Sequence, residues 1–149
     1  MRRLLFGLLL LFSFTVHAEE ATDSEVTDWA KNTLIYALSV DFNYQPTEAE
    51  KHSKGFTHNA WNAINIFLGG YMRTIRADKL SIHPQIIEGP TVVDSGTVSG
   101  IRFWRVNQVV LLPELNIRVA FSFVILATVP STSGSFIIQS MDMVKLESR

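Results

Sequence analysis

The chain has 149 residues, with 13 Lys and Arg against 14 Asp and Glu, and it contains no cysteine. This length is enough to bury one core, and the mildly acidic charge, mixed in sign along the chain, argues against nucleic acid as a partner. The lack of cysteine excludes disulfides, thiol catalysis, cysteine-bound metal and a lipid-bearing N-terminal cysteine, so packing alone must stabilise the fold.

The N-terminus has the pattern of a secretory signal peptide. Two arginines precede the apolar run 4–16, which ends in Val16-His17-Ala18, with small residues two apart just before Glu19. The run is shorter than the roughly 20 apolar residues that a membrane-spanning helix needs. We therefore expect a signal peptide over 1–18, cleavage between Ala18 and Glu19, and a single exported domain over 19–149 with no stable membrane insertion. A short uncleaved anchor is the alternative.

The spacing of apolar residues predicts a long helix at the start of this domain. Thr22 and Glu25 have the spacing of a capping box, in which each residue satisfies a backbone amide of the other. Apolar residues then recur at three- and four-residue steps as far as Ser39, which places them along one side of a helix.

Two more helices are expected before the spacing of the apolar residues changes from that of a helix to that of a strand. Residues 46–50 combine a proline with a second capping box, and they predict a short polar helix. Thr57 can cap a third helix, which Gly69-Gly70 is expected to end. One or two further turns as far as Lys79 also fit the pattern.

From Leu80 onward the apolar period is two, which is typical of strands. Predicted strands cover 80–86, 91–98, 101–112, 117–129 and 135–146, the first of them broken by Pro84. Gly89-Pro90 is expected to be a turn, and 94–96 a bulge. Apolar residues on both faces of 117–129 indicate a central strand. The fold class predicted is α+β, with N-terminal helices packed on a curved antiparallel sheet of about four strands.

Metal chemistry has weak support in the sequence. Glu48 and His52 would share one face of a short helix, and His58 lies nearby. A catalytic zinc needs three protein ligands, and the local sequence offers no third ligand to this pair. We expect neither a metal nor another cofactor.

Enzymatic chemistry is likewise hard to find. The chain has no Gly-x-Ser-x-Gly elbow and no glycine-rich phosphate loop. Asp41 beside Phe42, and Asp142 between two methionines, are the only acids in apolar settings. An acid held in an apolar pocket can transfer protons, so a small-ligand-binding or isomerase-like protein using one of them stays an alternative. We expect instead that Asp41 ends a helix and that Asp142 faces solvent.

The aromatic residues suggest a protein interface. Trp104 lies next to Phe103 on a predicted strand, so one ring points inward and the other outward. If Phe103 is inward, Trp104 stands with Arg102 on the outer face of the sheet, where Trp and Arg are typical interface anchors. If helices cover that face, Trp104 belongs to the core. We predict an interface formed by the sheet face or the first helix, through Trp29, Arg102 and Trp104.

The order of several motifs resembles the periplasmic domain of the DotI/IcmL family. A Trp-bearing helix over 26–30 leads into the stretch 36–44, which contains Tyr36 and Phe42-Asn43-Tyr44. Phe56-Thr57 and Trp61 are similar to the entry of the next helix in that family. The long strand 117–129 then ends in Pro130 and a short Ser/Gly loop before Phe136. Together these motifs cover nearly all of the exported domain.

The resemblance implies a VirB8-like fold, related to the nuclear-transport-factor-2 (NTF2-like) cone. It also implies a non-enzymatic periplasmic component of a Dot/Icm type IVB secretion system, or a paralogue of one. The implied partners are other secretion-system proteins or further copies of the chain. Family members usually carry a cytoplasmic segment and a transmembrane helix, which a signal peptide replaces in this sequence.

Overall fold

The computed structural model describes residues 20–131 and 134–147, so the predicted signal peptide and its cleavage site lie outside the described residues. The helical elements come first in the chain: α1 Asp23–Leu38, the 3-10 turn η1 Pro46–Glu48, α2 Ala49–His52 and α3 His58–Ala77. The strands follow: β1 Gln85–Val98, β2 Ile101–Leu112, β3 Ile117–Ser131 and β4 Gly134–Leu146, with the turn η2 Pro113–Leu115 before β3. Helices packed on a four-stranded antiparallel sheet confirm the predicted α+β class.

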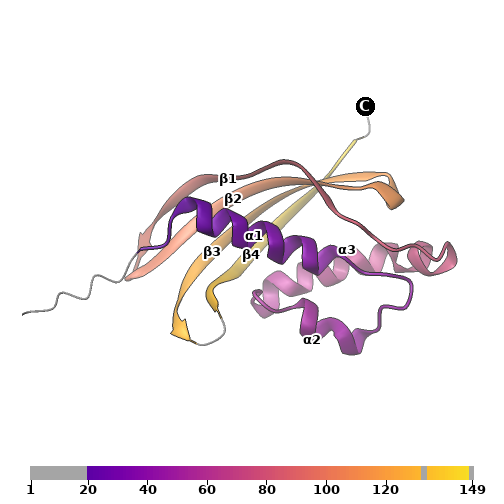
Figure 1. Cartoon of the computed structure of the whole chain (residues 1–149), viewed down its shortest axis with the longest axis horizontal. Coiled ribbons are helices and arrows are strands. Elements are labelled where there is room, and N and C mark those ends of the chain that lie inside the picture. The colour runs from indigo at the N-terminus through magenta and orange to yellow at the C-terminus, as the bar shows by residue number, and fades with distance from the viewer. Residues whose placement is uncertain (1–19, 132–133, 148–149) are drawn as a thin grey trace, which may run out of the picture.

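The sheet is a simple meander in the order β1-β2-β3-β4, and every neighbouring pair is antiparallel. β3 lies between β2 and β4, which confirms the central position predicted for 117–129. Figure 1 shows the helices gathered on one face of the twisted sheet. α1 lies along β1 and α3 lies along β4. The opposite face, called here the outer sheet face, carries none of the helices found within 20–131 and 134–147.

The core lies between the helices and the inner sheet face. The inner side chains of β2 and β3 are buried, whereas the alternate residues of both strands are exposed or half-buried. α1 adds apolar side chains from one side of the helix, as its spacing predicted. The buried residues of these three elements are Val26, Ala30, Leu34, Ala37, Leu38, Trp104, Val106, Gln108, Val110, Leu112, Ile117, Val119, Phe121, Phe123 and Ile125.

The predicted cap of α1 is present in full. The Thr22 hydroxyl accepts a hydrogen bond from the Glu25 amide at 3.2 Å, and the Glu25 carboxylate accepts one from the Thr22 amide at 2.7 Å. These bonds satisfy two amides that have no partner inside the helix. Hydrogen bonds from Thr22 also hold the pKa of the Glu25 carboxyl below its ordinary value.

The spacing of Thr47 and Glu50 predicts a cap at Thr47 and a helix from residue 48, but the helical segment begins two residues earlier. Its first residue is Pro46, and the Glu48 carboxylate accepts a hydrogen bond from the Gln45 amide at 3.0 Å. The expected cap at Thr47 is therefore wrong. Proline is well suited to the first position of a helix, and Pro46 moves the start toward the N-terminus.

The predicted end of α3 at Gly69-Gly70 is wrong, since the helix continues to Ala77. Both glycines are exposed, so the missing side chains cost no packing, and the apolar face resumes with the buried Ile75. The helix ends where Lys79 takes a positive φ of 50°, and the Leu80 amide donates to the Ile75 carbonyl at 2.9 Å. This is the return bond typical of a helix C-terminus. The predicted cap by Thr57 is confirmed.

The turn expected at Gly89-Pro90 is also wrong, because both residues lie inside the single strand β1. The register against β2 shifts on either side of Glu88 and again before Asp94. Gly89 has a φ of +75°, and a Cβ there would lie 2.7 Å from the Asn107 carbonyl oxygen. The glycine is thus needed for an irregular edge strand rather than for a turn. The strand expected over 80–86 begins only at Gln85. Residues 80–84 form no strand, and Ser81 makes a single isolated bridge with Asp41.

Candidate protein-binding surface

The structure links the three predicted interface residues through one further ring. Trp29 on α1 lies 5.4 Å from Phe136 on β4, measured between ring centroids. Phe136 in turn meets Trp104 edge-on at 5.7 Å, a favoured geometry for aromatic pairs. The Arg102 guanidinium lies 5.4 Å from the centre of the Trp104 ring, within range of a cation–π contact. α1, β2 and β4 are thereby joined at one end of the sheet.

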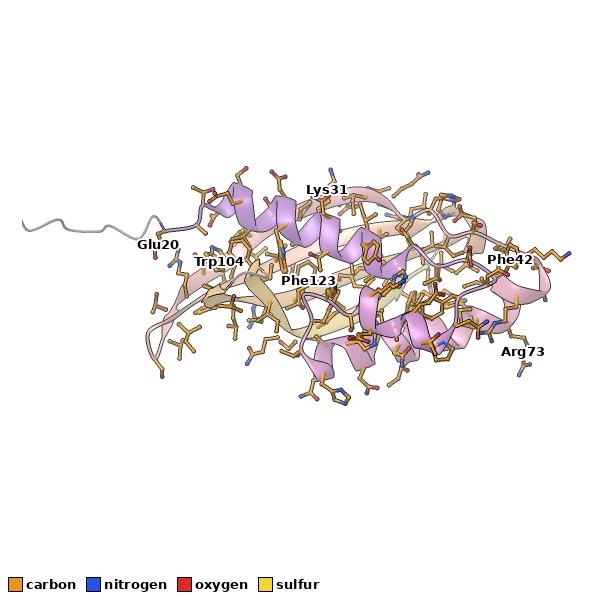
Figure 2. The ribbon with its side chains drawn as sticks, turned by 60° about the horizontal axis from the view of Figure 1, so that its bottom comes forward. Glu20, Lys31, Phe42, Arg73, Trp104 and Phe123 are labelled. Carbon is orange, nitrogen blue, oxygen red and sulfur yellow. The ribbon has the colours of Figure 1, made fainter. Side chains whose placement is uncertain are left out.

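Arg102 stands at the edge of this cluster. Its Nε makes no hydrogen bond with the described residues, but it lies 3.6 Å from the carboxylate of Glu20. Figure 2 shows Glu20 and Trp104 at the same end of the molecule, where the described chain begins. The exposed Glu20 makes this a weak ion pair.

Trp104 does not lie on the outer sheet face. Only 1 % of its surface is exposed, and it shares the inner face with Arg102 beneath the helical layer. Phe103 is the outward ring. Of the two orientations left open by the sequence, the core position is the one found, because the α1 helix covers this face of β2. Trp104 can therefore support Arg102 but offers no free surface to a partner, whereas Trp29 is half-buried.

The outer sheet face provides the exposed apolar surface instead. Gly96 lies under the Phe103 ring, which a Cβ at that position would approach to 3.0 Å. Around this ring β1, β2 and β3, with one residue of β4, form a shallow hollow of about 460 Å³. The residues lining it are Val98, Ser99, Ile101, Phe103, Arg105, Val124, Leu126 and Gln139. Ile101 is 48 % exposed, and no helix of the described part of the chain covers it.

The outer face of the sheet is one of the two surfaces that the sequence predicts as an interface, but the residues that line the hollow are not the ones it predicts. The apolar residues on both faces of β3 predict a central strand, and they also supply apolar surface to the face that the helices leave open. In the structure Val124 and Leu126 are half-buried and line the outer hollow. Apolar residues on a face without a helix are what an interaction surface requires.

The two acids considered for catalysis lie in polar settings. Asp142 is exposed and pairs in register with Ser122 on the outer sheet face. The expectation that Asp41 ends a helix is wrong, because Ser39 is the C-cap of α1, and the Asp41 carboxylate instead accepts a hydrogen bond from the Asn43 amide at 2.7 Å. Neither acid is buried in an apolar pocket, which is the setting that raises a carboxyl pKa for proton transfer.

The residues considered for metal binding do not converge. The His52 ring stacks on Tyr36 at 4.7 Å, and its Nδ1 donates to the Tyr36 carbonyl oxygen at 3.0 Å. His58 is exposed at the start of α3. Within 20–131 and 134–147, no three His, Asp or Glu side chains are grouped so that they could hold a metal ion. In the same part of the chain no helix has the length and apolar content to cross a bilayer.

Several solved structures have this fold. The periplasmic domain of DotI matches with a TM-score of 0.68 and 19 % identity, over 85 % of this chain and 98 % of that one. An IcmL-like type IV secretion system protein from Legionella pneumophila matches with a TM-score of 0.64 and 12 % identity, over 87 % and 96 %. A periplasmic fragment of TraM matches with a TM-score of 0.65 and 17 % identity, over 83 % and 98 %.

No protein-family model and no curated protein sequence matches the chain. The three structures are nevertheless covered almost completely, so the similarity extends over the whole domain and not over one shared motif. The chain therefore has the fold of the DotI/IcmL-like periplasmic domains, as its sequence resemblance implies.

Proposed function

We propose that the chain is a non-enzymatic periplasmic component of a Dot/Icm-type IV secretion system, or a paralogue of one, and that it acts by binding other proteins. The observation that carries this proposal is the fold. One structural neighbour is named as a type IV secretion system protein, and the other two are named as periplasmic. The fold alone does not determine a role, so the proposal also depends on the surface of this chain.

The outer sheet face supports binding to protein. An uncovered, mostly apolar hollow at the end of a sheet is a typical docking surface. Arg105 at its border adds a charged group that can orient a partner. Trp29 and Arg102, on the helix side of the same end, would extend the contact. The partners proposed are other secretion-system proteins or a second copy of the chain.

The alternative of a small-ligand-binding or isomerase-like cone has less support. It requires a deep apolar pocket with a buried acid, and Asp142 is exposed on the sheet. Asp41 lines a polar, open hollow between the end of α1, the short helix α2 and the segment 81–83.

Location in the periplasm rests on the N-terminal pattern and on the neighbours. We propose that residues 1–18 direct export and are removed between Ala18 and Glu19. The remaining single domain, 19–149, would then act without stable membrane insertion.

Crosslinking in cells followed by pull-down of the tagged protein tests the proposed function. Two matched variants sharpen it: Ile101→Asp on the outer sheet face, and Ile66→Asp on α3, where Ile66 is 69 % exposed. The wild type and Ile66→Asp should retrieve secretion-system proteins, and Ile101→Asp should lose them, because an aspartate in an apolar contact must be desolvated. Recovery of soluble metabolic proteins alone, or equal recovery with both variants, would contradict the proposal.

A further inference from the structure

A second hollow lies on the other side of the molecule, away from the outer sheet face. It has a volume of about 320 Å³ and is formed by the chain between α1 and α2 together with the segment 81–83. Its lining residues are Ser39, Val40, Asp41, Tyr44, Glu48, His52, Ser81, Ile82 and His83. The isolated bridge between Asp41 and Ser81 joins the two walls. The hollow is therefore built by tertiary contacts and not by one loop.

Each of the two carboxylates in this hollow uses only one of its oxygens in a hydrogen bond. Asp41 uses one oxygen to accept from the Asn43 amide, and Glu48 uses one to accept from the Gln45 amide. The second oxygen of each has no hydrogen bond with the described residues, and neither acid forms an ion pair there. The guanidinium of Arg76 donates to the Tyr44 carbonyl at 3.2 Å and neutralises neither. The wall thus keeps two unneutralised negative charges.

Tyr44 supplies an independent indication of a ligand. Its side chain is only 7 % exposed, yet its hydroxyl has no hydrogen-bond partner among the described residues. Burial raises the pKa of this hydroxyl, and the nearby Glu48 carboxylate raises it further, so the hydroxyl stays protonated. A buried hydroxyl without a partner costs free energy, and native proteins rarely keep one without a reason.

One of the two histidines in the same wall adds an acceptor. A carbonyl oxygen only accepts, so the Nδ1 of His52 carries a proton that it donates to Tyr36. The Nδ1 of His83 lies 2.8 Å from the Glu114 carboxylate and likewise carries a proton. In the neutral form of the His52 imidazole Nε2 is then the acceptor, whereas His83 pairs with Glu114 and is not counted as an acceptor. Carboxylate oxygens and an imidazole nitrogen together favour a ligand that is rich in N–H donors.

We propose that this hollow binds a guanidinium or ammonium group, held by the carboxylates of Asp41 and Glu48 beside the Tyr44 hydroxyl. The volume suits one such group with its alkyl stem. The group can belong to an arginine or lysine of a polypeptide or to a free small amine. A planar guanidinium carries five donors and fits this set of acceptors best. The site goes beyond the proposed secretion role and does not depend on it.

Titration of the purified protein, followed by backbone amide NMR shifts, tests the site. The probe is N-acetyl-arginine amide, and its neutral near-isostere N-acetyl-citrulline amide is the matched control. The arginine probe should shift amides of 39–48 and 81–83, and the citrulline probe should bind at least about tenfold more weakly, because charge-assisted bonds are the stronger ones. Equal binding of the two probes, or equal shifts caused by inorganic phosphate, would overturn the proposal.

Isosteric variants locate the charge. Glu48→Gln keeps an oxygen for the Gln45 amide and should weaken binding of the arginine probe about tenfold. Glu50 is an exposed acid on the adjoining helix α2 that does not line the hollow, so Glu50→Gln should leave binding unchanged. Tyr44→Phe should weaken binding severalfold without lowering the unfolding temperature, whereas Tyr71→Phe should leave binding unchanged. If Glu48→Gln and Glu50→Gln bind the probe alike, the site is not the one proposed.

A last comparison identifies the source of the group. Agmatine carries the guanidinium as a free small amine, and a pentapeptide with one central arginine carries it on a chain. Tighter binding of the peptide by about tenfold or more would identify a polypeptide ligand. Equal or tighter binding of agmatine would identify a free amine. Both results support recognition of the cation, and failure of both ligands to bind would refute it.

Discussion

Replacement of Gly89 by alanine tests the irregular edge strand that the sequence did not predict. An alanine with a φ of +75° costs about 1–2 kcal/mol, because its Cβ crowds the backbone in the left-handed region. That Cβ would also lie 2.7 Å from the Asn107 carbonyl oxygen, which is backbone and cannot rotate away. This crowding can be relieved only by a shift of β1 against β2, which costs about a further 1–2 kcal/mol. Gly89→Ala should therefore lower the free energy of unfolding by about 2–4 kcal/mol.

The same change in α3 should have the opposite sign. Gly70 lies inside the helix, and a Cβ there would have nothing within 4 Å. Gly70→Ala should raise the free energy of unfolding by about 0.5–1 kcal/mol, because alanine restricts the unfolded chain and favours helix. Urea unfolding followed by tryptophan fluorescence and circular dichroism measures both variants, with unchanged m-values as the check on two-state behaviour. If Gly89→Ala is as stable as the wild type, or if Gly70→Ala is less stable, the assigned backbone is wrong.

Further variants probe the cap, the core and the surface charges. Thr22→Ala removes the capping hydroxyl of α1 and should cost about 1 kcal/mol in the same urea assay, and an unchanged midpoint would contradict the capping box. Gln108 is 2 % exposed and its amide has no partner among the described residues, so Gln108→Met should stabilise by about 1–3 kcal/mol, and a loss of stability would show that the amide is paired. Partial burial alone would raise the pKa of the Glu114 carboxyl, but hydrogen bonds from its own amide and from His83, with the charge of His83, hold it below the ordinary value. A carboxyl with a lowered folded pKa stabilises above its unfolded pKa and loses that effect as pH falls through the folded pKa. The stability advantage of the wild type over Glu114→Gln should therefore shrink between about pH 6 and about pH 3, and an advantage independent of pH would refute it.

The sequence predicted the elements that local rules determine. Thr22 and Glu25 form their capping box from neighbours three residues apart, and the alternation over 117–129 is visible in the chain itself. The resemblance to a known family predicted the fold that the solved structures have. These features need no knowledge of what packs against them.

The failed predictions concern residues whose role depends on distant parts of the chain. Gly69-Gly70 has the composition of a helix end, but burial of Ile75 against the core favours continuation. Gly89 has the composition of a turn, yet its conformation is required by Asn107 on the neighbouring strand. The orientation of Trp104 followed from which sheet face the helices cover, and alternation in one strand cannot reveal that.

The candidate surfaces likewise combine features that the local sequence reveals with features that depend on distant parts of the chain. Arg102 and Trp29 were found from residue type, and their connection through Phe136 required the fold. The hollow around Asp41 and Glu48 joins segments about 40 residues apart, so only the tertiary structure shows that the His83 ring shares a wall with them.

Site-specific photocrosslinking in living cells tests most directly whether the outer sheet face binds protein. A photoreactive amino acid replaces Val124 in the outer hollow, or Lys31 on the exposed side of α1 as the control (Figure 2). The proposed interface predicts a discrete adduct from position 124, identified by mass spectrometry as a secretion-system protein or a second copy of the chain, and none from position 31. No adduct at position 124, or the same adducts from both positions, would contradict it.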